Sequence, residues 1–150
     1  MEKQSDVIIR KAVREDLPQI FALYQELQPD DPPTNEGMAT AVWDKALDSG
    51  VTYFVAEIGG DVVATCYIAI IPNITRGCSP IGFIENIVTS ASYRRIGIGK
   101  KLLKATVEYA KEQGCYKATL QSNSKRSEAH EFYKAVGFDG NSKRAFEIRF

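Results

Sequence analysis

The sequence predicts one domain of mixed α/β class. Its 150 residues suit a single hydrophobic core, since a second core would be too small to bury much apolar surface. Short β-branched runs alternate with segments whose apolar residues repeat at helical spacing, in the order β-α-α-β-β-β-α-β-α-β. We therefore expect residues 1–150 to form a central mixed sheet flanked by helices, with one functional site.

The first two helices follow a short strand. Residues 7–13 are rich in β-branched side chains and predict the strand. Residues 17–28 and 38–49 predict the helices, and the breaker-rich segment 29–37 separates them. The positions at helical spacing are Leu17, Ile20, Phe21, Tyr24 and Leu27 in the first helix and Met38, Val42, Trp43 and Leu47 in the second.

Three strands are expected in the middle of the chain. Residues 51–58 and 62–72 are β-rich and are separated by Gly59-Gly60-Asp61, which predicts a hairpin. After a loop over residues 73–80, Ile81 to Thr89 predicts a fourth strand. These strands would form the centre of the sheet.

The last third of the chain predicts two helices and two further strands. The helix over residues 101–114 ends at Gly114, and residues 115–121 alternate as a fifth strand. Residues 129–136 have apolar side chains at helical spacing and predict a helix that ends at Gly137. Residues 143–150, KRAFEIRF, predict a closing strand.

Composition excludes several function classes. Basic and acidic residues number 19 each, so the net charge offers no general attraction for nucleic acid or a membrane surface. The three cysteines contain no CxxC pair, which argues against a disulfide framework and against a zinc site, and we expect no metal. The first twenty residues lack the pattern of a signal peptide, so we expect a cytoplasmic protein.

The segment YRRIGIGK, residues 93–100, lies between the fourth strand and a helix and predicts a phosphate-binding loop. A helix N-terminus offers unpaired N–H groups and positive potential, and glycines allow the main chain to approach a ligand closely. Lys101 in place of Ser or Thr excludes a P-loop, and Leu102 breaks the dinucleotide pattern GxGxxG. The alternative is an ordinary basic turn before a helix.

The residues Arg94-Arg95-Ile96-Gly97-Ile98-Gly99 resemble the motif of the GCN5-related N-acetyltransferases (GNAT family), which is Arg or Gln, two residues, Gly, one residue, Gly or Ala. The strand IENIVT and the later segment AHEFYKAVGF, residues 129–138, resemble two other blocks of that family. The expected order of elements also matches the family fold over essentially the whole chain.

This resemblance implies acetyl-CoA as the acyl donor and an amine as the acceptor. It implies that main-chain N–H groups of the loop hold the pyrophosphate, that the end of the fourth strand pairs with the pantetheine arm, and that Val88 N–H polarises the thioester carbonyl. Arg126 replaces the asparagine of many members, and we expect it to contact CoA or the substrate. The donor-binding residues so implied are Ile87, Val88, Thr89, Arg94, Arg95, Ile96, Gly97, Ile98, Gly99, Lys100 and Arg126.

Two side chains are candidates for the chemistry. The resemblance places Tyr133 as the acid that protonates the departing thiolate, whereas periodicity alone makes it a member of a core stripe. Glu85 stands in an apolar strand where a carboxylate is costly unless paired, and some family members use such a residue as a base acting through water. The alternative for Glu85 is a structural ion pair with lysine or arginine. Asn86 should point to the opposite face unless a β-bulge intervenes.

The acceptor is less clearly indicated. We expect a small-molecule primary amine rather than a protein, and residues 125–133 resemble the corresponding block of aminoalkylphosphonate acetyltransferases. The alternatives are a protein N-acetyltransferase, a non-catalytic acyl-CoA-binding or sensing module, and a plain interaction domain. Family members often dimerise, and residues 143–150 are the candidate strand for pairing.

Overall fold

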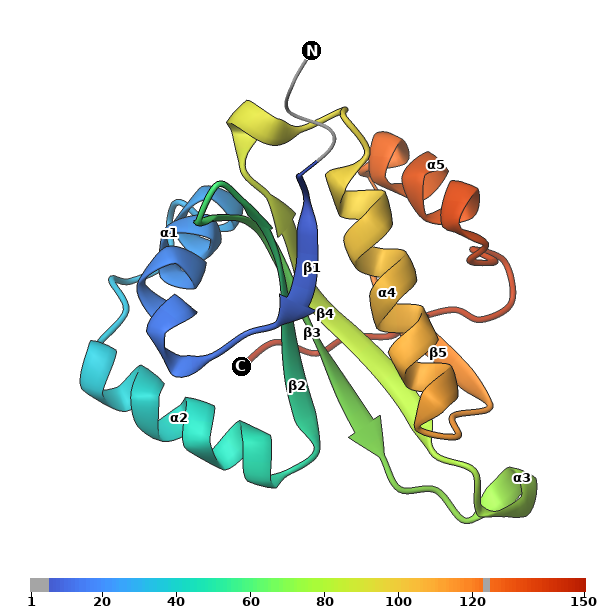
Figure 1. The fold of residues 1–150 in the computed structure, drawn as a ribbon. Coiled ribbons are helices and arrows are strands. Elements are labelled where there is room, and N and C mark those ends of the chain that lie inside the picture. Colours follow the sequence, from blue (N-terminus) through green and yellow to red (C-terminus); the bar gives the residue numbers. More distant parts are fainter. Residues whose placement is uncertain (1–5, 123–124) are drawn as a thin grey trace.

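The protein is built around a five-stranded sheet (Figure 1). The computed structural model describes residues 6–122 and 125–150. The strands lie in the order β1-β2-β3-β4-β5. The pairs β1–β2, β2–β3 and β3–β4 are antiparallel, and β5 is parallel to β4. Their bounds are β1 Ile8–Lys11, β2 Val51–Ile58, β3 Asp61–Ile71, β4 Ile81–Thr89 and β5 Lys117–Leu120. The predicted mixed α/β fold with a central mixed sheet is confirmed.

Helices cover both faces of the sheet. In Figure 1, α1 and α2 lie on one side, and α4 and α5 lie on the other. Asn35 begins α2 by accepting a hydrogen bond from Met38 N at 3.0 Å, which satisfies one of the free N–H groups of the first turn. The bounds are α1 Leu17–Leu27, α2 Glu36–Asp48, α3 Thr75–Cys78, α4 Ile98–Glu112 and α5 Ser127–Val136. The short helix α3 lies inside the predicted loop 73–80.

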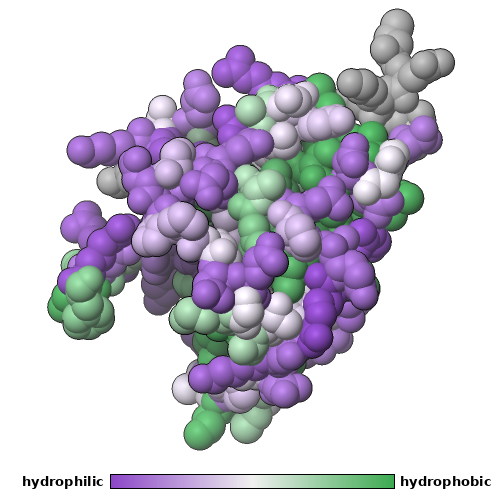
Figure 2. Space-filling view, turned by 90° about the vertical axis from the view of Figure 1, so that its left-hand side faces the viewer, coloured by the Kyte–Doolittle hydropathy of each residue, from purple (hydrophilic) through white to green (hydrophobic). Residues whose placement is uncertain are grey.

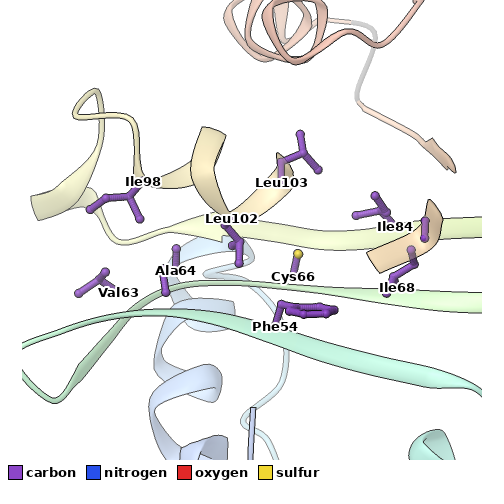
Figure 3. Close-up of a cluster of buried hydrophobic side chains, with 11 residues drawn as sticks. Phe54, Val63, Ala64, Cys66, Ile68, Ile84, Ile98, Leu102 and Leu103 are labelled. Carbon is purple, nitrogen blue, oxygen red and sulfur yellow. The ribbon is translucent and has the colours of Figure 1, made fainter. Parts of the chain in front are cut away.

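Two apolar clusters hold these layers together, because alternate residues of each strand face opposite sides. The larger cluster lies between the sheet and α4, where Phe54, Ile84 and Leu102 are buried (Figure 3). The smaller one lies under α1, where Ile20 and Val55 are completely buried. Neighbouring residues Phe54 and Val55 thus serve opposite faces of one strand.

A partly buried ion pair fixes the beginning of α1 against the sheet. Arg10 on β1 donates two hydrogen bonds to the Asp16 carboxylate, at 2.7 and 2.8 Å, and a third to Glu57 on β2 at 2.7 Å. The Asp16 carboxylate also accepts from Val13 N at 2.7 Å. The Arg10 hydrogen bond lowers the pKa of Asp16 below its ordinary value, and burial opposes that shift. The position of α1 therefore depends on side-chain electrostatics as well as on packing.

The predicted strand over residues 143–150 is wrong. The structure gives no strand there, and Phe146, Ile148 and Phe150 are exposed. The segment alternates apolar and polar residues as a strand does, but a strand also needs a partner for its backbone groups. Within the described residues this segment pairs with none of the five strands.

The structure also gives the state of the cysteines and the character of the helices. Cys66, Cys78 and Cys115 are free thiols, as their number and spacing predicted. In residues 6–122 and 125–150, no helix combines the length and the apolar character needed to span a membrane. The expected absence of a metal stays a prediction.

Candidate active site

The predicted phosphate-binding loop leads directly into α4. Arg95 and Gly97 have positive φ, 65° and 86°, so the chain turns sharply twice before the helix begins at Ile98. The first main-chain bond of the helix runs from Lys101 N to Gly97 O, at 3.1 Å, which leaves the N–H groups of residues 98–100 without helical partners. A Cβ placed on Gly97 would meet no atom within 4 Å. The first turn of α4 therefore has main-chain donors without helical partners next to open space at Gly97, which are features of an anion site.

The two glycines of this loop act differently. Gly97 is needed for its positive φ, which side chains other than glycine rarely adopt. Gly99 has ordinary helical geometry, but a Cβ there would lie 3.2 Å from Thr89 Oγ1 and 3.4 Å from Phe132 Cζ. The absence of a side chain thus lets α4 approach the end of β4 and α5 closely.

Strand β4 separates from β5 beside this loop. Pairing between them runs from Ile81 opposite Lys117 to Ile84 opposite Leu120 and ends there. On its β5 side, the rest of β4 up to Thr89 has no partner strand among the described residues. Ile87, Val88 and Thr89 lie on this separated part, as predicted, while the Val88 side chain is buried under α1. An extended ligand can pair with this main chain as a strand would.

A β-bulge interrupts β4 at the centre of the site. Tyr67 pairs with Glu85, whereas Thr65 pairs with Val88, so β4 uses one residue more than β3 over this stretch. Asn86 takes a left-handed conformation, φ 53°, which absorbs the extra residue. The bulge that the sequence analysis left open is therefore present, and Asn86 lines the same side of the sheet as Tyr24.

Glu85 is half-buried rather than enclosed by apolar side chains. Tyr67 lies opposite it on β3. The charge of Glu85 contributes to raising the pKa of both Tyr67 and Tyr133, although burial is the main cause in each case. In the described part of the chain Glu85 forms no ion pair, so the alternative structural role with lysine or arginine finds no support.

Tyr133 lies on α5 at the border of the larger cluster. Its ring is 5.3 Å from that of Phe132 and 6.3 Å from that of Phe138, centroid to centroid. Burial raises its pKa above the ordinary value of 10.0, and the nearby charge of Arg126 opposes this shift. The phenol is therefore protonated at neutral pH. Tyr133 can therefore pack in the apolar cluster, as its periodicity predicts, and still carry the proton that the resemblance to the family requires of it.

Two of the three predicted arginines, Arg94 and Arg126, are exposed to solvent. Arg126 occupies the position before α5 and is exposed. Arg94 is also exposed, and its Nε donates to Thr89 O at 3.1 Å, which ties the loop to the end of β4. Lys100 is exposed in the first turn of α4, and Ile98 is buried. Contacts of these residues with a ligand stay predictions.

Sequence reasoning missed a cavity on the other side of β4. It has a volume of about 150 Å³ and lies between α1, the loop that follows α1, and the bulge. Its lining residues are Tyr24, Gln25, Leu27, Gln28, Asp31, Pro32, Thr34 and Asn86. Tyr24 offered a signal, since it is the one member of the predicted apolar stripe of α1 that ends in a hydroxyl group.

The cysteines take no evident part in the site. Burial raises the pKa of Cys66 to about 12, and its thiol lies 3.3 Å from Thr106 Oγ1 inside the larger cluster. Burial also raises the pKa of Cys115. A nucleophilic thiolate needs the opposite shift, so neither thiol is activated.

Comparison with known proteins agrees with this geometry. A model of the acetyltransferase (GNAT) family matches residues 17–138, and the chain belongs to that family. An aminoalkylphosphonate N-acetyltransferase from Salmonella typhimurium is 30% identical over 92% of this chain and 91% of its own length. A glucosamine 6-phosphate N-acetyltransferase from Trypanosoma brucei brucei is 34% identical, but the match spans only 61% of this chain and 60% of that relative.

Solved structures show the same fold. One from Agrobacterium tumefaciens str. C58, described as a proposed acetyltransferase, has a TM-score of 0.90 and 39% identity and covers 95% of this chain and 99% of its own. An acetyltransferase from Trypanosoma brucei has a TM-score of 0.84 and 28% identity, with coverages of 97% and 100%.

Proposed function

We propose that the protein transfers the acetyl group of acetyl-CoA to the primary amine of a small molecule. The observation that carries this proposal is the meeting of two features at one place. The loop before α4 presents main-chain donors to open space. The neighbouring strand β4 leaves β5 beyond Ile84, beside Glu85 and Asn86. Small amines are the acceptors named for the relatives from Salmonella and Trypanosoma brucei brucei.

The donor site fits acetyl-CoA, which supplies the activated acetyl group as a thioester. Main-chain N–H groups from Arg95 to Lys100 would bind the pyrophosphate at the positive end of α4. Main-chain groups of residues 87–89 would pair with the pantetheine arm where β5 is absent. Val88 N–H would donate to the thioester oxygen as negative charge develops there.

Glu85 and Tyr133 divide the proton transfers. A bond forms between the amine nitrogen and the acetyl carbon while the carbon–sulfur bond breaks. Glu85 accepts, through water, the proton that the amine loses, and Tyr133 donates its phenolic proton to the departing thiolate. The raised pKa of Tyr133 keeps that proton in place at neutral pH. Arg126, near Tyr133, would contact the donor or the acceptor.

The test combines binding with turnover. We expect calorimetric titration to show binding of acetyl-CoA but not of ATP or NAD, and the Gly97→Asp, Gly99→Asp double variant to lose it. Lys104→Asp, which adds a carboxylate to an exposed position of the same helix, should still bind. When small amines are added to the wild type with acetyl-CoA, we expect release of the CoA thiol, which measures acetyl transfer.

Other outcomes would favour the alternatives. Binding with no transfer to any amine or peptide would favour a sensing module, and transfer to peptides alone would favour a protein N-acetyltransferase. If the folded wild type does not bind acetyl-CoA, the loop is an ordinary basic turn and the protein is better described as an interaction domain.

We also propose that the protein forms a homodimer through residues 143–150. Phe146, Ile148 and Phe150 are exposed at alternate positions, and they would share one face of a strand. Antiparallel pairing of two such segments about Ile148 places Glu147 of each copy opposite Arg149 of the other. Arg149→Glu should therefore lower the mass measured by light scattering to that of a monomer, and adding Glu147→Arg should restore the dimer. A monomeric wild type would contradict this.

A further inference from the structure

The cavity beside the bulge is placed to hold the acceptor. It lies on the α1 side of β4 and is lined by Asn86, the residue next to Glu85. The donor-binding loop and α5 lie across the sheet from it, since Figure 1 shows α1 and α5 on opposite sides. An amine in the cavity would approach the acetyl group from the face opposite to α5.

One hydroxyl group in the cavity lacks a partner. Tyr24 Oη is buried, and no described residue satisfies it with a hydrogen bond of ordinary geometry; the Asn86 side chain is the polar group beside it. Burial raises the pKa of Tyr24, and the Asn86 side chain nearby opposes the shift. A buried polar atom left without a hydrogen bond is costly, so such an atom beside a cavity indicates a polar ligand that would supply one.

The charge around the cavity is negative. Asp31 is the one acidic residue in the lining; Gln25, Gln28, Thr34 and Asn86 are neutral and polar, and no lysine or arginine lines it. The residues Leu27 and Gln28 stand at the C-terminal end of α1, the negative end of its dipole, which has no basic residue in its last turn. These features favour an ammonium group.

A phosphate would find no cationic partner among the residues that line the cavity. Phosphate groups in proteins are bound by arginine, lysine or free N–H groups of a helix N-terminus. The nearest helix start in sequence, that of α2, has Asn35 bonded to Met38 N and Glu36 in its first turn. The exposed Arg126 belongs to the start of α5 and is absent from the lining.

We propose that this cavity binds the acceptor and selects an amine whose second polar group is an ammonium or a hydroxyl rather than a phosphate or phosphonate. This inference rests on the proposed function of the site. It distinguishes the chain from two relatives whose names include phosphorus-bearing acceptors, glucosamine 6-phosphate and aminoalkylphosphonate.

Three acceptors of equal chain length test the selection: 1,3-diaminopropane, 3-amino-1-propanol and 3-aminopropylphosphonate. We expect kcat/KM to fall in that order, with the phosphonate about a hundredfold below the diamine because a like charge lies opposite Asp31. A phosphonate that reacts as well as the diamine would overturn the inference while leaving the proposed function standing.

Variants of the loop separate the cavity from general surface charge. Asp31→Lys should change the diamine-to-phosphonate ratio of kcat/KM by about tenfold in favour of the phosphonate, the effect of reversing one partly exposed charge. Asp30→Lys is the matched control, because it makes the same change of charge at an exposed neighbour outside the lining and should leave the ratio unchanged. Equal effects of the two variants would show that the cavity does not select the acceptor.

A binding measurement keeps the two proposals distinguishable. The three amines are titrated by NMR into the protein saturated with CoA, and the order of their affinities is read without any turnover. An enzyme that transfers acetyl to none of them, nor to any other small amine, would contradict the proposed function. The affinity order would then still support the inference if the diamine binds best, and overturn it if the phosphonate does.

Discussion

The two sides of β4 are built from different parts of the chain. On the proposed donor side the working groups would be main-chain N–H and C=O groups, at the start of α4 and along residues 87–89. On the proposed acceptor side they would be side chains: Tyr24 on α1, Asp31 in the loop that follows it, and Glu85 on β4. A site made of backbone depends on conformation, whereas a site made of side chains changes with each substitution. Relatives can therefore share a donor site and differ in acceptors.

The largest effect is expected from removing the hydroxyl group of Tyr133, the acid proposed on α5. Tyr133→Phe should lower kcat by about a hundredfold or more, the usual contribution of a general acid, and should leave the binding of acetyl-CoA unchanged. Steady-state kinetics and calorimetry measure the two quantities. A kcat within a factor of two of wild type would leave Tyr133 with its packing role alone.

The same tyrosine predicts a pH dependence. Burial raises its pKa above 10.0, so the phenol holds its proton over the whole neutral range and would lose it only at a pH above that value. Wild-type kcat should therefore fall on the alkaline side through loss of the acid, and Tyr133→Phe should lack that fall. A profile of kcat against pH for both enzymes decides the point.

The next largest effect on transfer is expected at Glu85 on β4, the proposed base. Glu85→Gln keeps the shape of the side chain and removes its ability to accept a proton, so kcat/KM for the amine should drop by about tenfold to a hundredfold. Acetyl-CoA affinity serves as the internal control. An unchanged kcat/KM across pH would remove Glu85 from the mechanism.

A single methyl group tests the donor side. Gly99→Ala places a Cβ 3.2 Å from Thr89 Oγ1, so either α4 or the end of β4 must move by a few tenths of an ångström. We expect acetyl-CoA binding to weaken by about tenfold while KM for the amine stays the same, because misplaced main-chain donors lose most of their hydrogen-bond energy. If amine KM rose equally, the two sides would not be independent.

The same contrast explains what the sequence could predict. The predicted phosphate-binding loop contains a continuous motif at residues 94–99, so the sequence alone could indicate it. Helix periodicity is also a local property, and it placed α1, α2, α4 and α5 correctly. The bulge at Asn86 depends on register with β3, and the cavity depends on a loop folding back from α1, so neither has a local pattern. The strand prediction for residues 143–150 was wrong for a related reason, because an alternating sequence does not show whether a partner strand is present.

The smallest effect on transfer concerns the ion pair that positions α1. Asp16 is nearly buried and Arg10 is about one-third exposed, so removing the carboxylate with Asp16→Asn should cost about 1 to 2 kcal/mol of folding stability at pH 7. The folded-state pKa of Asp16 lies below its ordinary value of 3.8. Its stabilisation is therefore complete above pH 3.8 and is lost as the pH falls through the lower folded value.

Urea unfolding at pH 7 and pH 3 should thus show a stability difference between wild type and Asp16→Asn that shrinks in acid. Asp44→Asn is the matched control, because its pair with Arg14 is more than half exposed and should contribute little at either pH. Since α1 carries Tyr24 and precedes the loop with Asp31, KM for the amine should rise a few-fold in Asp16→Asn without change in acetyl-CoA affinity. Weakened donor binding instead would mean that α1 supports both sides of β4, and the division between backbone and side-chain sites would not hold.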